Sequence, residues 1–434
     1  MELLAPAGGV DQLKAAISFG ADAVYLAGHD FGMRARAANF DIEGIAEAVE
    51  LAHCAGVSVY VACNVMMMQE DIETLPEFLE NVDDARADAL IIGDLGALSL
   101  ARRYAPHCRI HVSTQASVAN SEAAKMWHSL GAKRIVCARE MTLAEIASMR
   151  RAIPDDLELE TFVHGAQCMA VSGRCLISSY LAERSGNRGD CTQPCRWHYS
   201  LVEEKRPGEY ISVEESERGS LVMNAMDLNM IDHLAELQDA GVDSVKIEGR
   251  NKKAFYVATV VNAYRQALDL LYSGESVEKT DSCMEALRSE LLDVSHRPYS
   301  EGFFYGEPKQ AIDYDGYEQQ TLHVADVTDC RTLPEGMHLL SLRCRNRFSE
   351  GDRLEVLSPS STFREIEIRD LRHAGTIPAD GCGCASDASD ACAIDAIGKV
   401  EVANRTSDIY TAVCPFPLEP GSFLRARTFR RTSR

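Results

Sequence analysis

Short apolar segments alternate with amphipathic segments over residues 1 to about 271. Segments such as VDQLKAAISFG and LAEIASMRRAI repeat apolar residues at helical spacing, and a glycine often follows such a segment. The apolar segments are typical of parallel strands whose two faces are both covered. We predict strands at Glu2–Leu4, Ala23–Leu26, Val57–Ala62, Ala89–Ile92, Arg109–Val112, Arg134–Val136, Glu158–Phe162 and Ser244–Ile247.

This alternation predicts an α/β fold, a TIM-like (β/α)8 barrel over residues 1–271. A doubly wound open sheet is the alternative, but APAGGV after the first strand lacks the GxGxxG spacing typical of that fold. Strand seven is followed by an interruption, so we place a cysteine-bearing insertion at about residues 163–225. In a barrel this loop lies at the end where active sites are built.

The pattern changes after the barrel. Residues 272–320 contain one helical segment, CMEALRSELLDV, and an irregular stretch, which we interpret as a connector. Residues 321–434 alternate apolar and polar positions in short runs, which predicts a small β-barrel-like domain. A segment of flexible composition interrupts this domain and contains Cys382, Cys384 and Cys392. We expect this segment to be an exposed loop; a second metal site is the less favoured alternative.

Composition narrows the classes of function. The net charge of −22 argues against a broad, nonspecific nucleic-acid-binding surface, although a local basic patch can still bind RNA. No apolar run approaches the roughly 18 residues of a membrane span, and the N-terminus lacks signal-peptide features, so we expect a soluble, cytoplasmic protein. Two basic patches stand out: Lys246, Arg250, Lys252 and Lys253, and, at the C-terminus, Arg425, Arg427, Arg430, Arg431 and Arg434.

The cysteines give the strongest chemical signal. Four of the fifteen follow the spacing Cys-x6-Cys-x15-Cys-x3-Cys among glycines and polar residues: Cys168, Cys175, Cys191 and Cys195. Others lie singly in apolar segments and are expected to be buried as small hydrophobes: Cys54, Cys63, Cys108 and Cys137.

Thiolates ligate both iron–sulfur clusters and zinc, so the four clustered cysteines predict a metal centre. Disulfides are disfavoured because the cysteine count is odd and no secretion signal is recognisable. Structural zinc usually uses tighter Cys-x2-4-Cys pairs, and unliganded thiols are the remaining alternative. We therefore favour an iron–sulfur cluster; four ligands favour the 4Fe–4S type, although a 2Fe–2S cluster also takes four thiolates.

Polar residues gather where the barrel strands are predicted to end. They are His29, Asp30, Asn64, Asp94, Ser113, Thr114, Gln115, Glu140, His164, Glu248 and Arg250. Asp94 and Ser113 are expected to cap helices. We select Gln115, His164, Glu248 and Arg250 as catalytic or substrate-binding candidates because they closely follow clear strands. No GxSxG or HExxH motif marks a hydrolase.

The stretch ETFVHGAQCMAVSGRCLIS, residues 160–178, resembles the signature of the collagenase-like peptidase family of unassigned catalytic mechanism. Gln167 departs from it, because the signature has an aliphatic residue at that position. LLAPAG, GADAVYL, STQASVAN and the run from PGEY to VKIEGR are similar to the same family. The resemblance covers about residues 1–305.

Within this family, GDCTQPCRWHY and SVKIEGRNKKAFYVA most resemble the prephenate-dependent tRNA uridine hydroxylases. The resemblance implies hydroxylation of the wobble uridine of tRNA to 5-hydroxyuridine, with prephenate as co-substrate. It also implies a 4Fe–4S cluster on the four clustered cysteines and dependence on iron–sulfur assembly machinery. Alternatives are a peptidase, a hydroxylase of ribosomal RNA or a quinone precursor, and a non-catalytic RNA-binding module.

Overall fold

The computed structural model of the protein describes residues 1–34, 37–168, 170–171, 173–197, 200–202, 210–212, 225–273, 277–308, 317–359, 364–376 and 398–427. The chain forms two compact units. The first comprises residues 1–289 and 295–318, and the second comprises residues 290–294 and 319–434.

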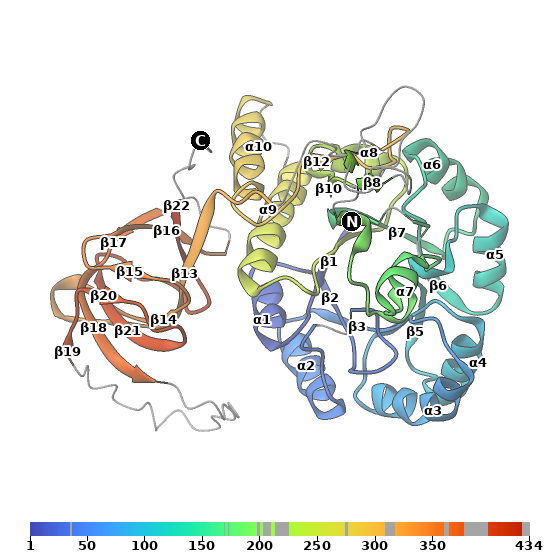
Figure 1. Cartoon of the computed structure of the whole chain (residues 1–434), viewed down its shortest axis with the longest axis horizontal. Helices are drawn as coiled ribbons and strands as arrows, with labels where there is room; N and C mark the ends of the chain where they lie inside the picture. Colours follow the sequence, from blue (N-terminus) through green and yellow to red (C-terminus); the bar gives the residue numbers. More distant parts are fainter. Residues whose placement is uncertain are drawn as a thin grey trace. The chain divides into compact units, whose positions relative to one another are not determined.

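The first unit is a closed parallel barrel surrounded by helices (Figure 1). Neighbouring strands pair in chain order, and β11 pairs with both β7 and β1, which closes the ring. The predicted (β/α)8 barrel is therefore confirmed. Its strands are β1 (Glu2–Pro6), β2 (Ala23–Leu26), β3 (Ser58–Cys63), β4 (Ala89–Ile92), β5 (Arg109–Val112), β6 (Ala132–Val136), β7 (Glu158–Ala166) and β11 (Ser244–Ile247).

Capping side chains and glycines set the ends of several helices between the strands. Asp94 caps its helix by accepting hydrogen bonds from the backbone N–H groups of Gly96 and Ala97, and Ser113 caps a 3-10 turn, as predicted. Gly56, after α2, takes a positive φ that ends that helix. The helices are α1 (Val10–Ser18), α2 (Ile42–Cys54), α3 (Gln69–Asp84), α4 (Leu95–Tyr104), α5 (Ser121–Ser129), α6 (Leu143–Ala152), α8 (Leu234–Asp239), α9 (Ala254–Ser273) and α10 (Val277–Leu291).

Residues 167–243 separate β7 from β11, although the two strands are neighbours in the barrel. This insertion contains α7 (Ile177–Ala182), the hairpin strands β8 (Ser200–Val202) and β9 (Tyr210–Ser212), and β10 (Asp227–Asn229). Strand β10 runs antiparallel to the end of β7, and β12 (Tyr299–Ser300) pairs with β10. The sheet thus extends outward at the point where the insertion leaves the barrel.

Charged side chains fill part of the barrel interior. Lys246 Nζ lies 2.8 Å from Glu160 Oε1, and Arg134 Nη1 lies 3.1 Å from Glu160 Oε2 and 2.6 Å from Glu2 Oε1. Glu160 is 0% exposed. Lys246 therefore does not belong to a surface basic patch, because its strand position turns it inward to meet this carboxylate.

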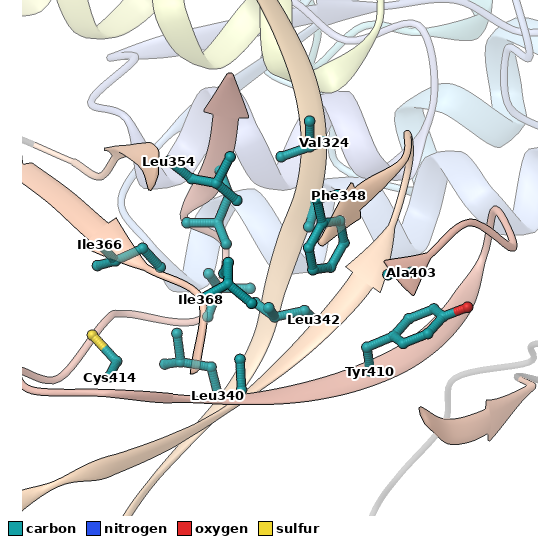
Figure 2. Packing of buried hydrophobic residues seen from close by; sticks show 14 of the residues in the cluster. Val324, Leu340, Leu342, Phe348, Leu354, Ile366, Ile368, Ala403, Tyr410 and Cys414 are labelled. Carbon is teal, nitrogen blue, oxygen red and sulfur yellow. The ribbon is translucent and has the colours of Figure 1, made fainter. Parts of the chain in front are cut away.

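The second unit is a curled antiparallel sheet, which confirms the predicted β-rich fold. Its strand order is β17-β16-β22-β13-β14-β21-β18-β19. Apolar side chains of these strands form its core, where Figure 2 shows residues such as Leu342, Phe348 and Tyr410. The strands are β13 (Thr321–Thr332), β14 (His338–Cys344), β16 (Arg353–Leu357), β17 (Arg364–Glu367), β18 (Arg369–Thr376), β19 (Gly398–Lys399), β21 (Asp408–Cys414) and β22 (Phe423–Arg427), with β15 (Phe348–Ser349) and β20 (Val402–Ala403) forming a separate pair.

Two expectations about single residues are wrong. Arg425, which the sequence placed in a C-terminal basic patch, is 1% exposed and forms ion pairs with Glu290, Asp293 and Glu355. Cys54 is exposed at the end of α2, whereas Cys63, Cys108 and Cys137 are buried as expected. Arg430, Arg431, Arg434 and the cysteines of the predicted loop, Cys382, Cys384 and Cys392, lie outside the described residues.

A search of the described helices finds none whose length and apolar content would suffice to cross a bilayer.

The interior ion network generates a stability prediction. Glu160→Gln should leave the Lys246 ammonium buried without a carboxylate and lower the free energy of barrel unfolding by about 3–5 kcal/mol. Glu160→Gln combined with Lys246→Met should recover part of this loss, because the unpaired charge is then gone. Urea unfolding of the wild type, Glu160→Gln, Lys246→Met and the double variant measures both effects. Strictly additive losses would contradict this account.

Candidate active site

A cavity of about 470 Å³, including its solvent-open part, opens among residues at the carboxyl-terminal ends of the barrel strands. Its charged lining consists of four cations and one carboxylate: Arg34, Arg139, Lys246, Arg250 and Glu248. Asn64, Ser113, Thr114 and Gln115 add polar groups, and Tyr25 and Phe162 add aromatic faces. The cavity is therefore locally cationic within an acidic protein, which favours an anionic ligand.

Glu248 organises two of these cations. Its Oε1 accepts a hydrogen bond from Arg34 Nε at 3.2 Å, and its Oε2 lies 3.5 Å from Arg139 Nη2. Burial acts to raise the pKa of Glu248, but Arg34, Arg139 and Arg250 outweigh it and hold that pKa below its ordinary value. A carboxylate of this kind is a weak base, so its geometry suits positioning of the arginines better than proton abstraction.

Arg250 follows β11 and is only 3% exposed. Its Nη1 is buried without a hydrogen-bond partner among the described residues. Burial lowers the pKa of Arg250 to about 10, with Tyr25 and Glu248 opposing that effect. A buried guanidinium with an unused donor facing a cavity is suited to binding a carboxylate or phosphate.

Gln115 joins the barrel to the cysteine-bearing insertion. A Cβ on Gly173 would lie 2.5 Å from Gln115 Oε1 and 2.8 Å from the Gln115 carbonyl oxygen. Gly173 also has a φ of +76°. The insertion therefore needs glycine here, both for the backbone conformation and for its close approach to Gln115.

A second cavity, of about 1040 Å³ including its solvent-open part, is lined by all four clustered cysteines: Cys168, Cys175, Cys191 and Cys195. None of the four forms a disulfide. Met33, Arg34, Thr114, Gln115 and Arg139 line both cavities. The thiol-lined cavity and the cationic cavity therefore adjoin each other.

Backbone and side-chain groups act on the clustered thiols, and the thiols act on one another. The backbone N–H of Gln193 donates a hydrogen bond to Cys191 Sγ at 3.3 Å. Burial raises the pKa of Cys195, and the nearby thiols of Cys168, Cys191 and Cys175 add to the rise, while Arg196 lowers it. This mutual influence indicates that the four sulfur atoms are close enough to interact electrostatically.

Polar contacts anchor the cysteine-bearing segment to the barrel. Arg188 makes two hydrogen bonds to Asp71, with Nη1–Oδ2 2.6 Å and Nη2–Oδ1 2.9 Å. The N–H of Met66 donates to the Asn187 carbonyl, and Asn187 Oδ1 accepts from the N–H of Cys175. These bonds fix the segment over the loop between β3 and α3.

The donor set fits a metal centre in ligand type and in location. Four thiols on one solvent-accessible cavity match the ligands of iron–sulfur and zinc centres. Within the described residues, however, no three Cys, His, Asp or Glu side chains already lie close enough to hold one metal ion. Ligation would therefore require the sulfur atoms to move closer together.

His164 lies outside the cationic cavity, contrary to the expectation that it follows the strand into the site. Phe162 pairs with Lys246 and His164 pairs with Ile247, so the register skips Val163. This bulge turns His164 to the outer face of β7. There its ring lies 5.5 Å from the ring of Tyr264 and 5.3 Å from that of Tyr299.

Sequence reasoning missed two cations of the site. Arg139 follows β6, but the sequence pattern pointed to its neighbour Glu140 at that strand end. The Arg139 guanidinium lies 4.0 Å from the centroid of the Phe162 ring. Arg34 lies several residues beyond His29 and Asp30, in a loop that returns to the cavity. Only their positions after strands two and six could have drawn attention to them.

Fold and site together define a TIM-barrel protein with a thiol-lined cavity at the catalytic end of the barrel. The sequence matches the peptidase family U32 over residues 8–313. The chain belongs to this family.

Among its relatives, tRNA hydroxylation protein P1 of Bacillus subtilis is 36% identical over 373 residues, covering 82% of this chain and 83% of that protein. The tRNA hydroxylation protein P of Escherichia coli is 34% identical over 407 residues, covering 83% and 87%. A collagenase of Porphyromonas gingivalis is 32% identical over 316 residues, covering 70% and 74%.

The position of His164 generates a pH prediction. Burial, followed by the fields of His296 and Lys252, lowers the pKa of His164 to about 3. The unfolded chain has the ordinary value of about 6.5, so the stability that depends on neutral His164 is complete above that pH and falls as pH drops toward 3. Between pH 7 and 4.5 the wild type should lose about 2–3 kcal/mol more than His164→Phe.

Urea unfolding at the two pH values measures this difference. His29→Gln, at an exposed histidine, should change with pH as the wild type does. Parallel curves for His164→Phe and the wild type would show that His164 protonates as easily in the folded as in the unfolded protein.

Proposed function

We propose that this protein is a tRNA-modifying hydroxylase that converts the wobble uridine to 5-hydroxyuridine, with prephenate as co-substrate. The names of its relatives support an RNA-hydroxylating role: two are tRNA hydroxylation proteins of which this chain covers more than four fifths. The single structural observation that carries the proposal is that a thiol-lined cavity adjoins a cationic cavity and shares five lining residues with it.

In this proposal Cys168, Cys175, Cys191 and Cys195 hold a 4Fe–4S cluster, which the cell's iron–sulfur assembly machinery would supply. Such a cluster provides one-electron transfer, and its potential responds to hydrogen bonds at its sulfur ligands. The bond from the Gln193 N–H to Cys191 Sγ is one such contact.

The cationic cavity is the proposed site for the dianionic co-substrate. Arg250 offers an unused, buried N–H group to a carboxylate, and Glu248 keeps Arg34 and Arg139 in place beside it. Gln115 lies between this cavity and the thiols, so its amide is placed to orient a ligand at their junction. His164 has no part in this arrangement because its ring faces away from the cavity.

The proposed metal centre generates the first test. Protein purified without oxygen should be brown and contain roughly four irons per chain. Replacing any one of the four ligand cysteines with alanine should lower the iron content sharply, as measured by metal analysis and visible absorbance. Cys54→Ser and Cys283→Ser should keep the iron, because these residues lie on α2 and α10, away from the thiol-lined cavity. Colourless protein with stoichiometric zinc would overturn the cluster assignment.

The proposed reaction generates the second test. The wild-type gene should restore 5-hydroxyuridine-derived nucleosides to the tRNA of a deletion strain, and only in cells that make prephenate. Arg250→Ala and Glu248→Gln should reduce the modification more than about tenfold while keeping iron, since a lost charge-assisted hydrogen bond is worth about 1.5–3 kcal/mol. Mass spectrometry of digested tRNA measures the product.

A third test distinguishes the proposed hydroxylase from a peptidase. The relative named as a collagenase makes proteolysis the second candidate. Unchanged tRNA nucleosides in every strain, together with cleavage of denatured collagen by iron-free protein, would replace the hydroxylase proposal by a peptidase. Unchanged tRNA with altered ribosomal RNA or quinone would redirect the same chemistry to another substrate.

A further inference from the structure

A cluster of cations lies next to the thiol-lined cavity and does not include the cations of the cationic cavity inside the barrel. Arg196 and Asn251 line the thiol-lined cavity, and Lys252 follows Asn251 directly. Arg196 Nη1 lies 3.1 Å from Tyr317 Oη. Lys252 Nζ lies 5.1 Å, and Arg297 Cζ 5.5 Å, from the centroid of the Tyr317 ring. Three cations from separate segments therefore meet around one aromatic ring.

Few negative groups face these cations. In the described part of the chain, neither Arg196 nor Lys252 forms an ion pair; Lys252 Nζ instead donates to the Ser295 carbonyl, and Arg196 Nη2 to that of Gln167. The nearby carboxylate is Asp227, which is 2% exposed. Burial lowers the pKa of Lys252, and Arg196 and Arg297 lower it further while Asp227 and Tyr317 oppose them. Among the described residues, three cations and this one buried carboxylate meet around Tyr317.

The aromatic ring is accessible. Tyr317 is 50% exposed, although cations lie close to its ring. An exposed ring beside cationic side chains is the combination with which proteins bind unpaired nucleotides, by stacking on the base and by neutralising the phosphate. Cation–π attraction from these side chains also helps to hold the ring in its orientation.

We propose that Arg196, Lys252 and Tyr317 form a nucleotide-binding subsite that holds a phosphate and the base beside the reacting nucleotide, with Arg297 adding positive charge from beneath. This inference rests on the proposed RNA substrate and extends it to residues outside the catalytic cavity. It also divides the basic patch noted in the sequence: Arg250 is buried in the barrel, whereas Lys252 packs against the half-exposed ring of Tyr317.

Binding of unmodified tRNA over a range of salt concentrations tests the subsite. Lys252→Gln should weaken binding about five- to eightfold at 0.1 M salt and lower the slope of log K against log salt by about 1, as expected for one lost phosphate contact. Lys253→Gln is the matched control, because this exposed neighbour on the same loop is outside the cluster, and it should keep the wild-type affinity and slope.

Tyr317 tests the stacking component separately. Tyr317→Ala should weaken tRNA binding at least about fivefold with the salt slope unchanged, whereas Tyr317→Phe should retain most of the affinity because the ring remains. Iron content equal to that of the wild type shows that each variant keeps the neighbouring thiol site intact.

The outcomes separate the two proposals. If the wild type modifies tRNA but Lys252→Gln and Tyr317→Ala bind it as the wild type does, the subsite is wrong and the proposed function stands. If the wild type neither binds nor modifies tRNA, the proposed function fails, and the subsite fails with it.

Discussion

The buried pairing of Lys246 with Glu160 is the constraint on which the site depends. These residues lie on β11 and β7, which are neighbours in the barrel although residues 167–243 separate them along the chain. Arg134 on β6 and Glu2 on β1 extend the network across the two adjoining strands. Burying these charges costs desolvation energy that their attraction only partly offsets, so the network's clearest contribution is to fix which strand positions face inward. Once β7 and β11 are fixed, the insertion must leave and re-enter the barrel beside Gln115 and Glu248.

The pairing of β7 with β11 explains how thiols and cations come to share one site. The insertion folds back over the strand ends, and glycine at position 173 lets its backbone approach Gln115 more closely than any side chain would permit. Arg34 and Arg139 then line both cavities. In a chain of net charge −22, this concentration of cations produces a local field that attracts anions to the cavity. The acidic remainder of the protein therefore favours selective over general binding of polyanions.

The sequence predicted what depends on local periodicity and failed where partners are distant. Strand and helix periods were enough to predict the barrel, and the rule that strand ends face the site correctly brought Gln115, Glu248 and Arg250 to one cavity. His164 does not follow this rule because a bulge at Val163 reverses the alternation of inward- and outward-facing side chains along β7. Nothing in the local sequence marks that bulge. Lys246 and Arg425 looked like surface cations because their carboxylate partners, Glu160 and Glu290, lie far away in the sequence. Neither case can be decided without the tertiary structure.

The two groups of cations differ in depth, and this difference provides a means of substrate discrimination. Arg250 is 3% exposed and lines the cationic cavity inside the barrel, so the proposed function assigns it to the small dianion and not to the polynucleotide. Arg196, which lines the wider cavity, contacts Tyr317, and the half-exposed ring of Tyr317 is where we propose that a base stacks. A small carboxylate bound beside this exposed ring would meet screening by water and salt, so it gains more by entering the buried cavity. If both proposals hold, each substrate is therefore directed to its own zone by its size, and the two meet at Gln115 beside the thiols.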